Sequence, residues 1–246
     1  MTKYGMVIDL DKCVGCGACV AACISENLGP EVEKAMEEGR LEDLKLRTNV
    51  EEIEVGVFPK VRTFFYHNIC RQCENPPCVY VCPTGASYKN EDGIVLINED
   101  RCISCKYCIM ACPFNARYMD ELTMIPDKCT FCEHRLKEGK LPACVEACPT
   151  HARIFGELDE LLAEAKGSGK HMWRGEGFVE GGTSVIYLSG MPFKPILPKE
   201  KPISPVLVTK GREVVKYLGY IGIALVTAAS IAMIVANWAS RREVKE

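Results

Sequence analysis

The chain has 246 residues, a net charge of −3 and 16 cysteines. With 48% hydrophobic residues it is long enough to bury a sizeable core in one large domain or two small ones. It carries no long basic stripe, so nucleic acid is not an expected partner. A disulfide scaffold is not expected either, because disulfide-dense domains are short, and cysteines separated by two residues face one metal centre more readily than they bridge each other.

The N-terminal stretch MTKYGMVIDLDKC has no basic region followed by a long apolar core, so no signal peptide is expected there. The Arg241-Arg242 pair lies near the other end of the chain, where it cannot act as a twin-arginine export signal.

The cysteines form four groups of four, which we call tetrads 1 to 4. Tetrad 1 is Cys13, Cys16, Cys19 and Cys23. Tetrad 2 is Cys70, Cys73, Cys78 and Cys82. Tetrad 3 is Cys102, Cys105, Cys108 and Cys112, and tetrad 4 is Cys129, Cys132, Cys144 and Cys148.

Repeated sequences flank the tetrads. A short apolar run, an acid and a base precede tetrads 1, 3 and 4, as in MVIDLDKC, VLINEDRC and MIPDKC. Tetrads 2, 3 and 4 end in Cys-Pro and a strand-like run, whereas Ile24 follows the last cysteine of tetrad 1. These internal repeats predict a recurring unit of strand, ligand loop, short helix and strand. Between tetrads 2 and 3, YKNEDGIVLINED predicts a β-hairpin with its turn at residues 91–93.

Thiolates are soft ligands that suit zinc, copper(I) and iron–sulfur clusters. Structural zinc is usually held by two separated CxxC pairs, whereas C-x2-C-x2-C puts three ligands on one tight loop that can wrap a cubane. Gly15 and Gly17 would let the backbone of the first loop approach closely, and the prolines at Pro83, Pro113 and Pro149 would end each short ligand helix. The pattern favours [4Fe–4S] clusters, with zinc as the alternative.

Sixteen thiolates match four cubanes with none left over. In two-cluster ferredoxins the fourth cysteine of each run binds the neighbouring cluster. Each tetrad is therefore expected to give three ligands to one cluster and one ligand to another. Spacing alone leaves open which tetrads pair.

The segments outside the tetrads have their own patterns. Residues 25–69 contain EVEKAMEEGRLEDLKLR, which predicts a charged surface helix, with a solvated face favoured over a partner-docking face. LDELLAEAK at 158–166 predicts an amphipathic helix. GGTSVIYLSGMPF contains a predicted strand, and PFKPILPKEKPISP predicts an extended linker.

Residues 217–240 contain no charged side chain. A helix of this length is about 36 Å long, enough to cross a hydrocarbon core of about 30 Å. Tyr217, Tyr220 and Trp238 lie where interfacial anchors belong. The segment predicts a transmembrane helix, with a buried helix of a soluble protein as the alternative. A seam of small residues that could admit another membrane helix is formed by Ala224, Ala228, Ala232 and Ala236.

The motifs CVGCGAC, CRQCENPPCVYVCPTGA, CISCKYCIMACPFNAR and CTFCEHRLKEGKLPACVEACPTHA resemble the four-cluster iron–sulfur subunits of membrane-bound oxidoreductases. Such subunits serve molybdenum or tungsten enzymes of the dimethyl-sulfoxide-reductase class and nickel–iron hydrogenases. The resemblance covers most of residues 1–157. The strand, proline linker and single span that follow are similar to the formate dehydrogenase-N and hydrogenase-2 types.

This resemblance implies an α+β fold of two tandem bacterial-ferredoxin-like modules with insertions, each module holding two [4Fe–4S] clusters, plus one C-terminal transmembrane helix. The expected domains are a four-cluster domain at 1–157 with an insertion at 25–69, a helix-and-strand extension at 158–191, a linker at 192–213, a transmembrane helix at 214–240 and a charged tail at 241–246. Tetrads 1 and 4 would form one module, and tetrads 2 and 3 the other.

Carried over from the family, this pairing implies four ligand sets. Cluster A would be held by Cys13, Cys16, Cys19 and Cys148. Cluster B would be held by Cys23, Cys129, Cys132 and Cys144. Cluster C would be held by Cys70, Cys73, Cys78 and Cys112. Cluster D would be held by Cys82, Cys102, Cys105 and Cys108.

The resemblance also implies an electron-transfer subunit with no substrate-converting site of its own. It would carry single electrons between a catalytic subunit and a membrane cytochrome b or quinone-interacting subunit, which the 214–240 helix would contact within the lipid. Relatives place the cluster domain on the extracytoplasmic face, exported with a partner. A free membrane-anchored polyferredoxin and a zinc-stabilised interaction protein are the alternatives.

Two sets of basic side chains lie near the tetrads. One set could raise nearby reduction potentials or could consist of ordinary surface residues: Lys106, Arg117 and Arg135. Three histidines form no constellation with an acid and a nucleophile, and we interpret them as structural or surface residues: His67, His134 and His151.

Overall fold

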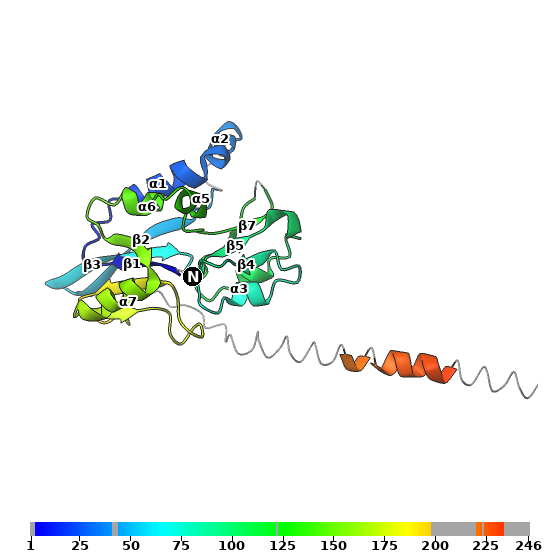
Figure 1. Cartoon of the computed structure of the whole chain (residues 1–246). Coiled ribbons are helices and arrows are strands. Elements are labelled where there is room, and N and C mark those ends of the chain that lie inside the picture. The colour runs from blue at the N-terminus through cyan, green and yellow to red at the C-terminus, as the bar shows by residue number, and fades with distance from the viewer. Residues whose placement is uncertain (1–2, 41–43, 122, 198–219, 223, 234–246) are drawn as a thin grey trace, which may run out of the picture. The chain divides into compact units, whose positions relative to one another are not determined.

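The computed structural model of the chain describes residues 3–40, 44–121, 123–197, 220–222 and 224–233. The chain divides into two compact units, Met1–Pro205 and Val206–Glu246. Each unit is described separately, and Figure 1 gives the labels of the elements.

A four-stranded sheet in the first unit joins strands from both ends of that unit (Figure 1). Its order is β8 (Arg153–Glu157), β1 (Tyr4–Asp9), β10 (Val185–Ser189) and β9 (His171–Trp173). β1 runs parallel to β10 and antiparallel to β8, and β9 is antiparallel to β10. The strand predicted in GGTSVIYLSGMPF is thus confirmed, and it lies beside the first strand of the chain.

The two faces of this sheet are both buried, because successive side chains point to opposite sides. Val7 packs on one face against α7 (Leu158–Gly167), the amphipathic helix predicted at 158–166. Met6 and Ile8 point to the other face, where they join a core that includes four cysteines, Cys19, Cys70, Cys129 and Cys144. The sheet therefore supports the ligand-bearing segments on one side and α7 on the other.

Two short hairpins lie close to the other tetrads. β4 (Ser87–Lys89) pairs with β5 (Val95–Ile97), which confirms the hairpin predicted between tetrads 2 and 3. β6 (Tyr118–Met119) pairs with β7 (Pro126–Asp127) between tetrads 3 and 4. Each hairpin joins the strand after one tetrad to the strand before the next, as the flanking repeats predict.

Short helices carry the third cysteine of tetrads 2, 3 and 4. α3 (Pro77–Tyr80), α4 (Tyr107–Met110) and α6 (Ala143–Glu146) each stop two residues before a Cys-Pro pair, consistent with the helix-ending role predicted for proline. α1 (Ala18–Asn27) has Ile24 instead and continues past Cys23 to Asn27. A further short helix, α5 (Glu133–Lys137), and a 3-10 turn, η2 (Glu99–Arg101), complete this part of the unit.

The insertion at 25–69 is only partly the helix that its charge pattern predicts. α2 (Gly29–Glu37) is helical, and residues 41–43 lie outside the described part of the chain. The rest forms a two-stranded ribbon of β2 (Thr48–Val57) and β3 (Lys60–Ile69). The charge pattern did not predict this ribbon, although alternating residues in EEIEVGV are typical of a strand.

The start of the predicted linker at 192–213 packs against the first unit. Phe193 and Ile196 are buried there and join the main core. Extended-linker behaviour is therefore wrong for residues 192–197, because two apolar side chains within them find a place in the core. The remaining residues of that linker, 198–213, lie outside the described part of the chain.

The second unit is helical at 220–222 and 224–233. No helix formed by the described residues is both long enough and apolar enough to span a membrane. The span predicted at 214–240 lies partly outside those residues.

Candidate metal centres

All sixteen cysteines are free. Half of them are buried, and Cys16 and Cys105 are the two exposed ones. The predicted ligands therefore include both interior and surface cysteines.

The elements of tetrads 1 and 4 pack against each other. β1 leads into tetrad 1 and β8 follows tetrad 4, and their antiparallel pairing sets Ile8 opposite Arg153. This register brings the loop of Cys13 and the turn of Cys148 to the same end of the sheet. Burial raises the pKa of the Cys19 thiol, and three neighbouring thiols raise it further: Cys13, Cys148 and Cys16.

The remaining cysteines of tetrads 1 and 4 surround a cavity of about 330 Å³. Burial raises the pKa of the Cys23 thiol to about 12, with the neighbouring thiols of Cys144 and Cys132 adding to the shift. Burial also raises the pKa of Cys129, beside Cys144 and Cys23. Four thiols therefore share one enclosed space on the sheet face opposite α7.

Tetrads 2 and 3 are brought together in the same manner by the β4–β5 hairpin and by contact between α3 and α4. Burial raises the pKa of the Cys73 thiol, and three neighbours raise it further: Cys70, Cys78 and Cys112. The pKa of Cys112 rises to about 11 for the same reasons.

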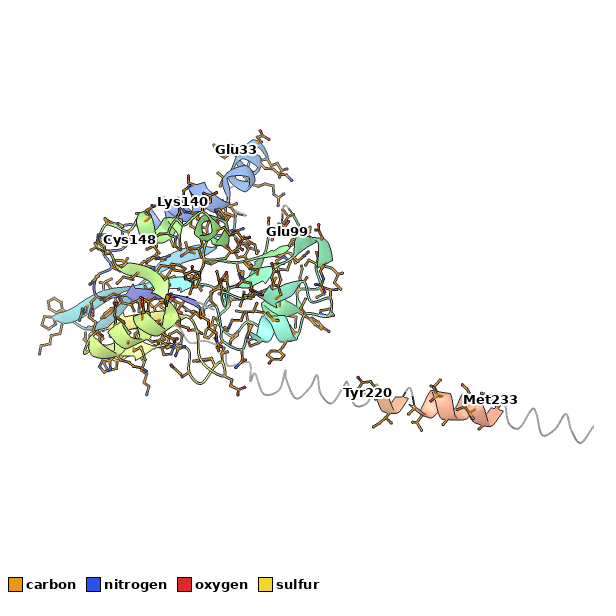
Figure 2. The ribbon with its side chains drawn as sticks, in the orientation of Figure 1. Glu33, Glu99, Lys140, Cys148, Tyr220 and Met233 are labelled. Carbon is orange, nitrogen blue, oxygen red and sulfur yellow. The ribbon has the colours of Figure 1, made fainter. Side chains whose placement is uncertain are left out.

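A second cavity, of about 340 Å³, lies among the other four cysteines of these tetrads. Its lining includes Cys82, Cys102, Cys105 and Cys108, together with Arg117. Figure 2 shows Cys148 of tetrad 4 and Glu99, just before tetrad 3, on opposite sides of the first unit.

Each tetrad begins with a turn in the left-handed backbone region. The residue just before the second cysteine has a positive φ in every tetrad: Gly15, Gln72, Ser104 and Phe131. The third residue after the last cysteine repeats this in tetrads 2, 3 and 4: Gly85, Asn115 and His151. Non-glycine residues adopt this region rarely, so the shared geometry identifies the four loops as structural repeats of one ligand-binding turn.

Hydrogen-bond donors surround the last cysteine of tetrads 2 and 4. The backbone N–H of Ser87 lies 3.4 Å from the Cys82 Sγ, and the Thr84 hydroxyl lies 3.7 Å from the same sulfur. The Thr150 hydroxyl lies 3.8 Å from the Cys148 Sγ. Burial alone would raise the pKa of Cys82 and Cys148, but hydrogen bonds to these sulfurs lower it overall.

Two family models match the chain. The 4Fe-4S dicluster domain matches residues 61–158, and the 4Fe-4S binding domain matches residues 4–23. The B subunit of sulfite dehydrogenase from Allochromatium vinosum is 44% identical over 175 residues, which cover 67% of this chain and 72% of the relative. The B subunit of polysulfide reductase from Wolinella succinogenes is 48% identical over 166 residues, 64% of this chain and 78% of the relative. The thiosulfate reductase electron transfer subunit PhsB of Salmonella typhi is 39% identical over 184 residues, 74% of this chain and 91% of the relative.

This chain belongs to the 4Fe–4S electron-transfer subunits of oxidoreductase complexes. The resemblance inferred from the cysteine motifs is therefore confirmed. The structure adds the side chains that surround the thiols in this iron–sulfur subunit.

Buried cationic side chains of the subunit that lie beside the thiols include Arg117, Lys128 and Arg153. Burial alone would lower the pKa of Arg153, but the negative charges of Cys144 and Cys19 raise it overall. Burial lowers the pKa of Lys128, although Cys70 and Cys129 act in the opposite direction. The sequence analysis noted Arg117 but neither Lys128 nor Arg153. Lys128 directly precedes a tetrad, as Lys12 and Arg101 do, and these two equivalent bases are exposed, so position in the sequence does not reveal the burial of Lys128.

The other bases noted in the sequence lie at the surface. Arg135 pairs with Glu26 at 2.7 Å. Lys106 is exposed, caps the N-terminus of α4 and lines the second cavity. His134 also contacts Glu26, at 2.9 Å, and His151 is exposed. These positions agree with the surface interpretation for both histidines.

His67 differs from the other two histidines that lie near the tetrads in the sequence. It is buried, and its Nε2 lies 3.2 Å from the Cys13 Sγ. Its interpretation as structural or surface therefore missed a direct contact with a predicted ligand. The separation of 54 residues along the chain hides this contact from the sequence.

The continuation of α1 past Cys23 brings an amide to two thiols. Asn27 Nδ2 lies 3.7 Å from the Cys23 Sγ and 3.6 Å from the Cys132 Sγ. Arg47 donates to Asn27 Oδ1 at 3.0 Å and pairs with Asp127 at 2.7 Å. The proline-free end of tetrad 1 thus places a hydrogen-bond donor beside tetrad 4.

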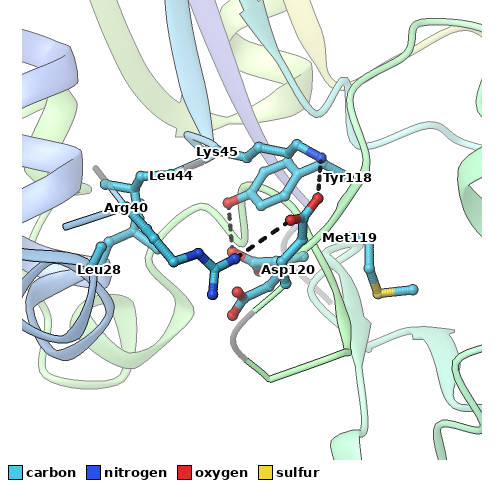
Figure 3. Close-up of a pocket in the computed structure, with 10 residues that line it drawn as sticks. Leu28, Arg40, Leu44, Lys45, Tyr118, Met119 and Asp120 are labelled. Atoms are coloured by element: carbon cyan, nitrogen blue, oxygen red, sulfur yellow. Dashed lines mark hydrogen bonds and ion pairs between the residues drawn. The ribbon is translucent and has the colours of Figure 1, made fainter. Parts of the chain in front are cut away.

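A pocket of about 410 Å³ lies next to this network, between α2 and the β6–β7 hairpin (Figure 3). Tyr118 donates to Asp127 at 2.8 Å in its wall, and Lys45 pairs with Glu121 at 3.2 Å. No predicted ligand cysteine lines the pocket, and Arg40 and Lys45 both pair with Glu121 in its wall.

The donor set fits iron–sulfur clusters. Four thiols surround each cavity, and thiolates are the ligands of such clusters. The Nη1 atoms of Arg117 and Arg153 are buried beside these thiols and have no hydrogen-bond partner among the described residues. A negatively charged cluster would supply an acceptor for these donors. Within the same residues, no three His, Cys, Asp or Glu side chains are arranged to hold a metal ion, so the fit depends on the thiols, the cavities and the unsatisfied donors.

Proposed function

We propose that this electron-transfer subunit holds four [4Fe–4S] clusters, A to D, through the four ligand sets that the family's pairing implies. The observation that carries the proposal is the grouping of the thiols. Cys19 has the other three ligands of cluster A as neighbours, and Cys73 has those of cluster C. The ligands of clusters B and D line one cavity each.

The clusters are arranged in the order A, B, C, D. α1 carries Cys19 for cluster A and Cys23 for cluster B. Cys129 of cluster B and Cys70 of cluster C both act on the buried ammonium of Lys128. α3 carries Cys78 for cluster C and ends two residues before Cys82 of cluster D. The two exposed ligands, Cys16 and Cys105, belong to the two ends of this order.

When bound, the clusters supply one-electron redox chemistry. The chain's own residues hold the thiolates in place, exclude water from eight of them, and set each potential through charge and hydrogen bonds. No substrate-converting site is needed for this role, in agreement with relatives that are named electron-transfer or B subunits.

The partners are a catalytic subunit at one end and a membrane quinone-interacting or cytochrome b subunit at the other. The names of three relatives refer to sulfite, polysulfide and thiosulfate. They favour a molybdenum- or tungsten-dependent enzyme for a sulfur compound over a nickel–iron hydrogenase. A free membrane-anchored polyferredoxin is the second candidate, favoured by the apolar C-terminal segment.

The four-cluster domain occupies residues 1–157, with its insertion at 25–69, and the extension follows at 158–191. Beyond the linker, a helix at 214–240 anchors the subunit in lipid and is followed by a charged tail at 241–246. Within the apolar helix, Thr227 donates to the Ala224 carbonyl and Ser230 to the Val226 carbonyl. Neither hydroxyl then requires water, as a lipid environment demands. The cluster domain lies on the extracytoplasmic face and is exported with its partner.

Purification in mild detergent tests these assignments. The expected result is a complex in which this subunit co-purifies with a larger subunit containing molybdenum or tungsten and oxidising or reducing a sulfur compound. A protein that elutes alone with all its iron would contradict the role as an electron-transfer subunit of a complex and would support the free polyferredoxin. Proteolysis of intact spheroplasts tests the membrane orientation. Protection of the cluster domain from the protease would contradict its placement on the extracytoplasmic face.

A further inference from the structure

We propose that His67 is a positioning residue that holds one N–H donor on the Cys13 sulfur and thereby raises the reduction potential of cluster A, with Arg153 fixing the orientation of that donor. His67 Nε2 lies 3.2 Å from the Cys13 Sγ. Its other ring nitrogen, Nδ1, lies 2.6 Å from Arg153 Nη2 and 3.2 Å from Arg153 Nε. The inference rests on the proposed function, because cluster A is part of it.

The partners of His67 determine its protonation. A guanidinium has only donors, so Nδ1 must accept the hydrogen bonds from Arg153 and carries no proton. A neutral imidazole then carries its proton on Nε2, the atom that faces Cys13. A doubly protonated ring would place an N–H against the N–H groups of Arg153. The Cys13 sulfur is therefore the acceptor of this hydrogen bond.

The donor cannot turn away easily, because both partners are fixed. His67 and Arg153 are each only 2% exposed. Arg153 Nη2 also donates to the Thr48 hydroxyl at 3.0 Å. The His67 backbone carbonyl accepts from the Tyr187 hydroxyl at 2.6 Å and from Arg71 Nη1 at 3.2 Å. Thr48 of β2 and Tyr187 of β10 thus hold the pair, whose two members belong to β3 and β8.

The effect on the potential has a defined sign. Reduction adds negative charge to a cluster and to its thiolate sulfurs. A hydrogen bond to a ligand sulfur stabilises that added charge, which raises the potential. The donor is the neutral ring, because Nδ1 accepts from Arg153 and the single ring proton is left on Nε2.

Two substitutions separate the donor from the rest of the side chain. In His67→Asn, the amide oxygen can take the place of Nδ1 and keep the contact with Arg153, but no atom reaches Cys13. In His67→Gln, the amide nitrogen can take the place of Nε2 and keep a donor on Cys13. EPR-monitored redox titration of the full-length complex should show cluster A shifted to a more negative potential in His67→Asn and close to wild type in His67→Gln.

The expected shift in His67→Asn is about three- to tenfold in the one-electron reduction equilibrium of one cluster, with the other three unchanged. The control is His171→Asn, an exposed histidine of β9 outside the tetrads, which should leave all potentials unchanged. Equal potentials in His67→Asn and wild type would overturn the proposal, as would an equal shift in His67→Asn and His67→Gln.

A measurement on the wild-type protein keeps the test independent of folding in the variants. The chain has only four histidines, so labelling the histidine rings with ¹⁵N introduces few labelled sites. Pulsed EPR of reduced cluster A should detect a nitrogen coupling that His67→Gln removes, and its absence from wild type would contradict the proposal. Iron analysis separates the two hypotheses: iron well below four clusters in wild type contradicts the proposed function, whereas full iron with unaltered potentials contradicts only the role of His67.

Discussion

The ligand sulfurs differ most in the donors that surround them. Cys82 and Cys148 are near hydroxyl groups of Thr84 and Thr150 in the repeated Cys-Pro-Thr sequence. The sulfur of Cys23 instead lies near the amide of Asn27. Local donors of this kind raise a cluster's potential, so single side chains are expected to tune single clusters.

Asn27→Leu should lower the potential of cluster B, because the amide near Cys23 and Cys132 is lost. The expected shift is on the order of 30 mV, about threefold in the one-electron equilibrium constant, and redox titration measures it. Asn49→Leu, an exposed asparagine of the β2–β3 ribbon, serves as the control. A potential for cluster B that stays at the wild-type value would contradict this role of Asn27.

Gly15→Ala should weaken the cluster A loop more than Gly17→Ala does. Both glycines have positive φ, near 68° and 74°, and an alanine there costs about 1–2 kcal/mol. A Cβ on Gly15 would in addition lie 2.3 Å from the Phe65 ring, whereas nothing lies within 4 Å of one on Gly17. Iron content and thermal unfolding of the two variants check this, and equal losses would show that the contact with Phe65 is unimportant.

At the scale of elements, sequence patterns predicted what is local and missed what depends on distant partners. The cysteines, the β4–β5 hairpin and α7 all follow from neighbouring residues. The pairing of β10 beside β1 joins segments about 180 residues apart, and no periodicity reveals it. The surface-helix prediction was based on EVEKAMEEGRLEDLKLR, which ends before β2 begins at Thr48, and no prediction was made for the β2–β3 ribbon that follows. Ile24 was informative: without proline, α1 continues far enough to place Asn27 near the thiols.

Lys170 connects the end of β1 to the segment after α7, where its ammonium lies 2.7 Å from Asp9 and 3.0 Å from Asp11. Burial alone would lower the pKa of Lys170, but these hydrogen bonds raise it overall. Burial alone would raise the pKa of Asp11, but Lys170 and its other partners lower it overall. The raised pKa of Lys170 contributes stability below pH 10.5 that is lost above it, and the lowered pKa of Asp11 contributes stability above pH 3.8 that is lost below it.

Lys170→Met should therefore destabilise the protein at neutral pH, and the difference from wild type should shrink at both pH extremes. Denaturant unfolding at several pH values measures it. Lys166→Met, an exposed lysine of α7, is the matched control. A difference that is constant across pH would contradict the assigned ion pairs.

At the scale of the molecule, three buried cations lie where neighbouring clusters would meet. Arg153 is beside ligands of clusters A and B, Lys128 beside ligands of B and C, and Arg117 beside ligands of C and D. The sequence predicted the thiols and Arg117 but not Lys128 or Arg153, because burial of a charged side chain depends on the assembled tetrads. Together they offset the negative charge that four clusters would concentrate in one unit.

Lys128→Met should shift clusters B and C together to more negative potentials while leaving A and D in place. The methionine has a similar length and carries no charge, so packing is largely retained. Redox titration of all four clusters provides the measurement, and Lys12→Met, the exposed base before tetrad 1, provides the control. A shift confined to one cluster would contradict the position of Lys128 between the two.

The central claim is that all sixteen cysteines serve four [4Fe–4S] clusters. Iron and acid-labile sulfide should each be determined per chain on anaerobically purified full-length protein. We expect about sixteen of each and no stoichiometric zinc. About twelve irons or fewer in fully loaded protein, or zinc in place of iron, would contradict it.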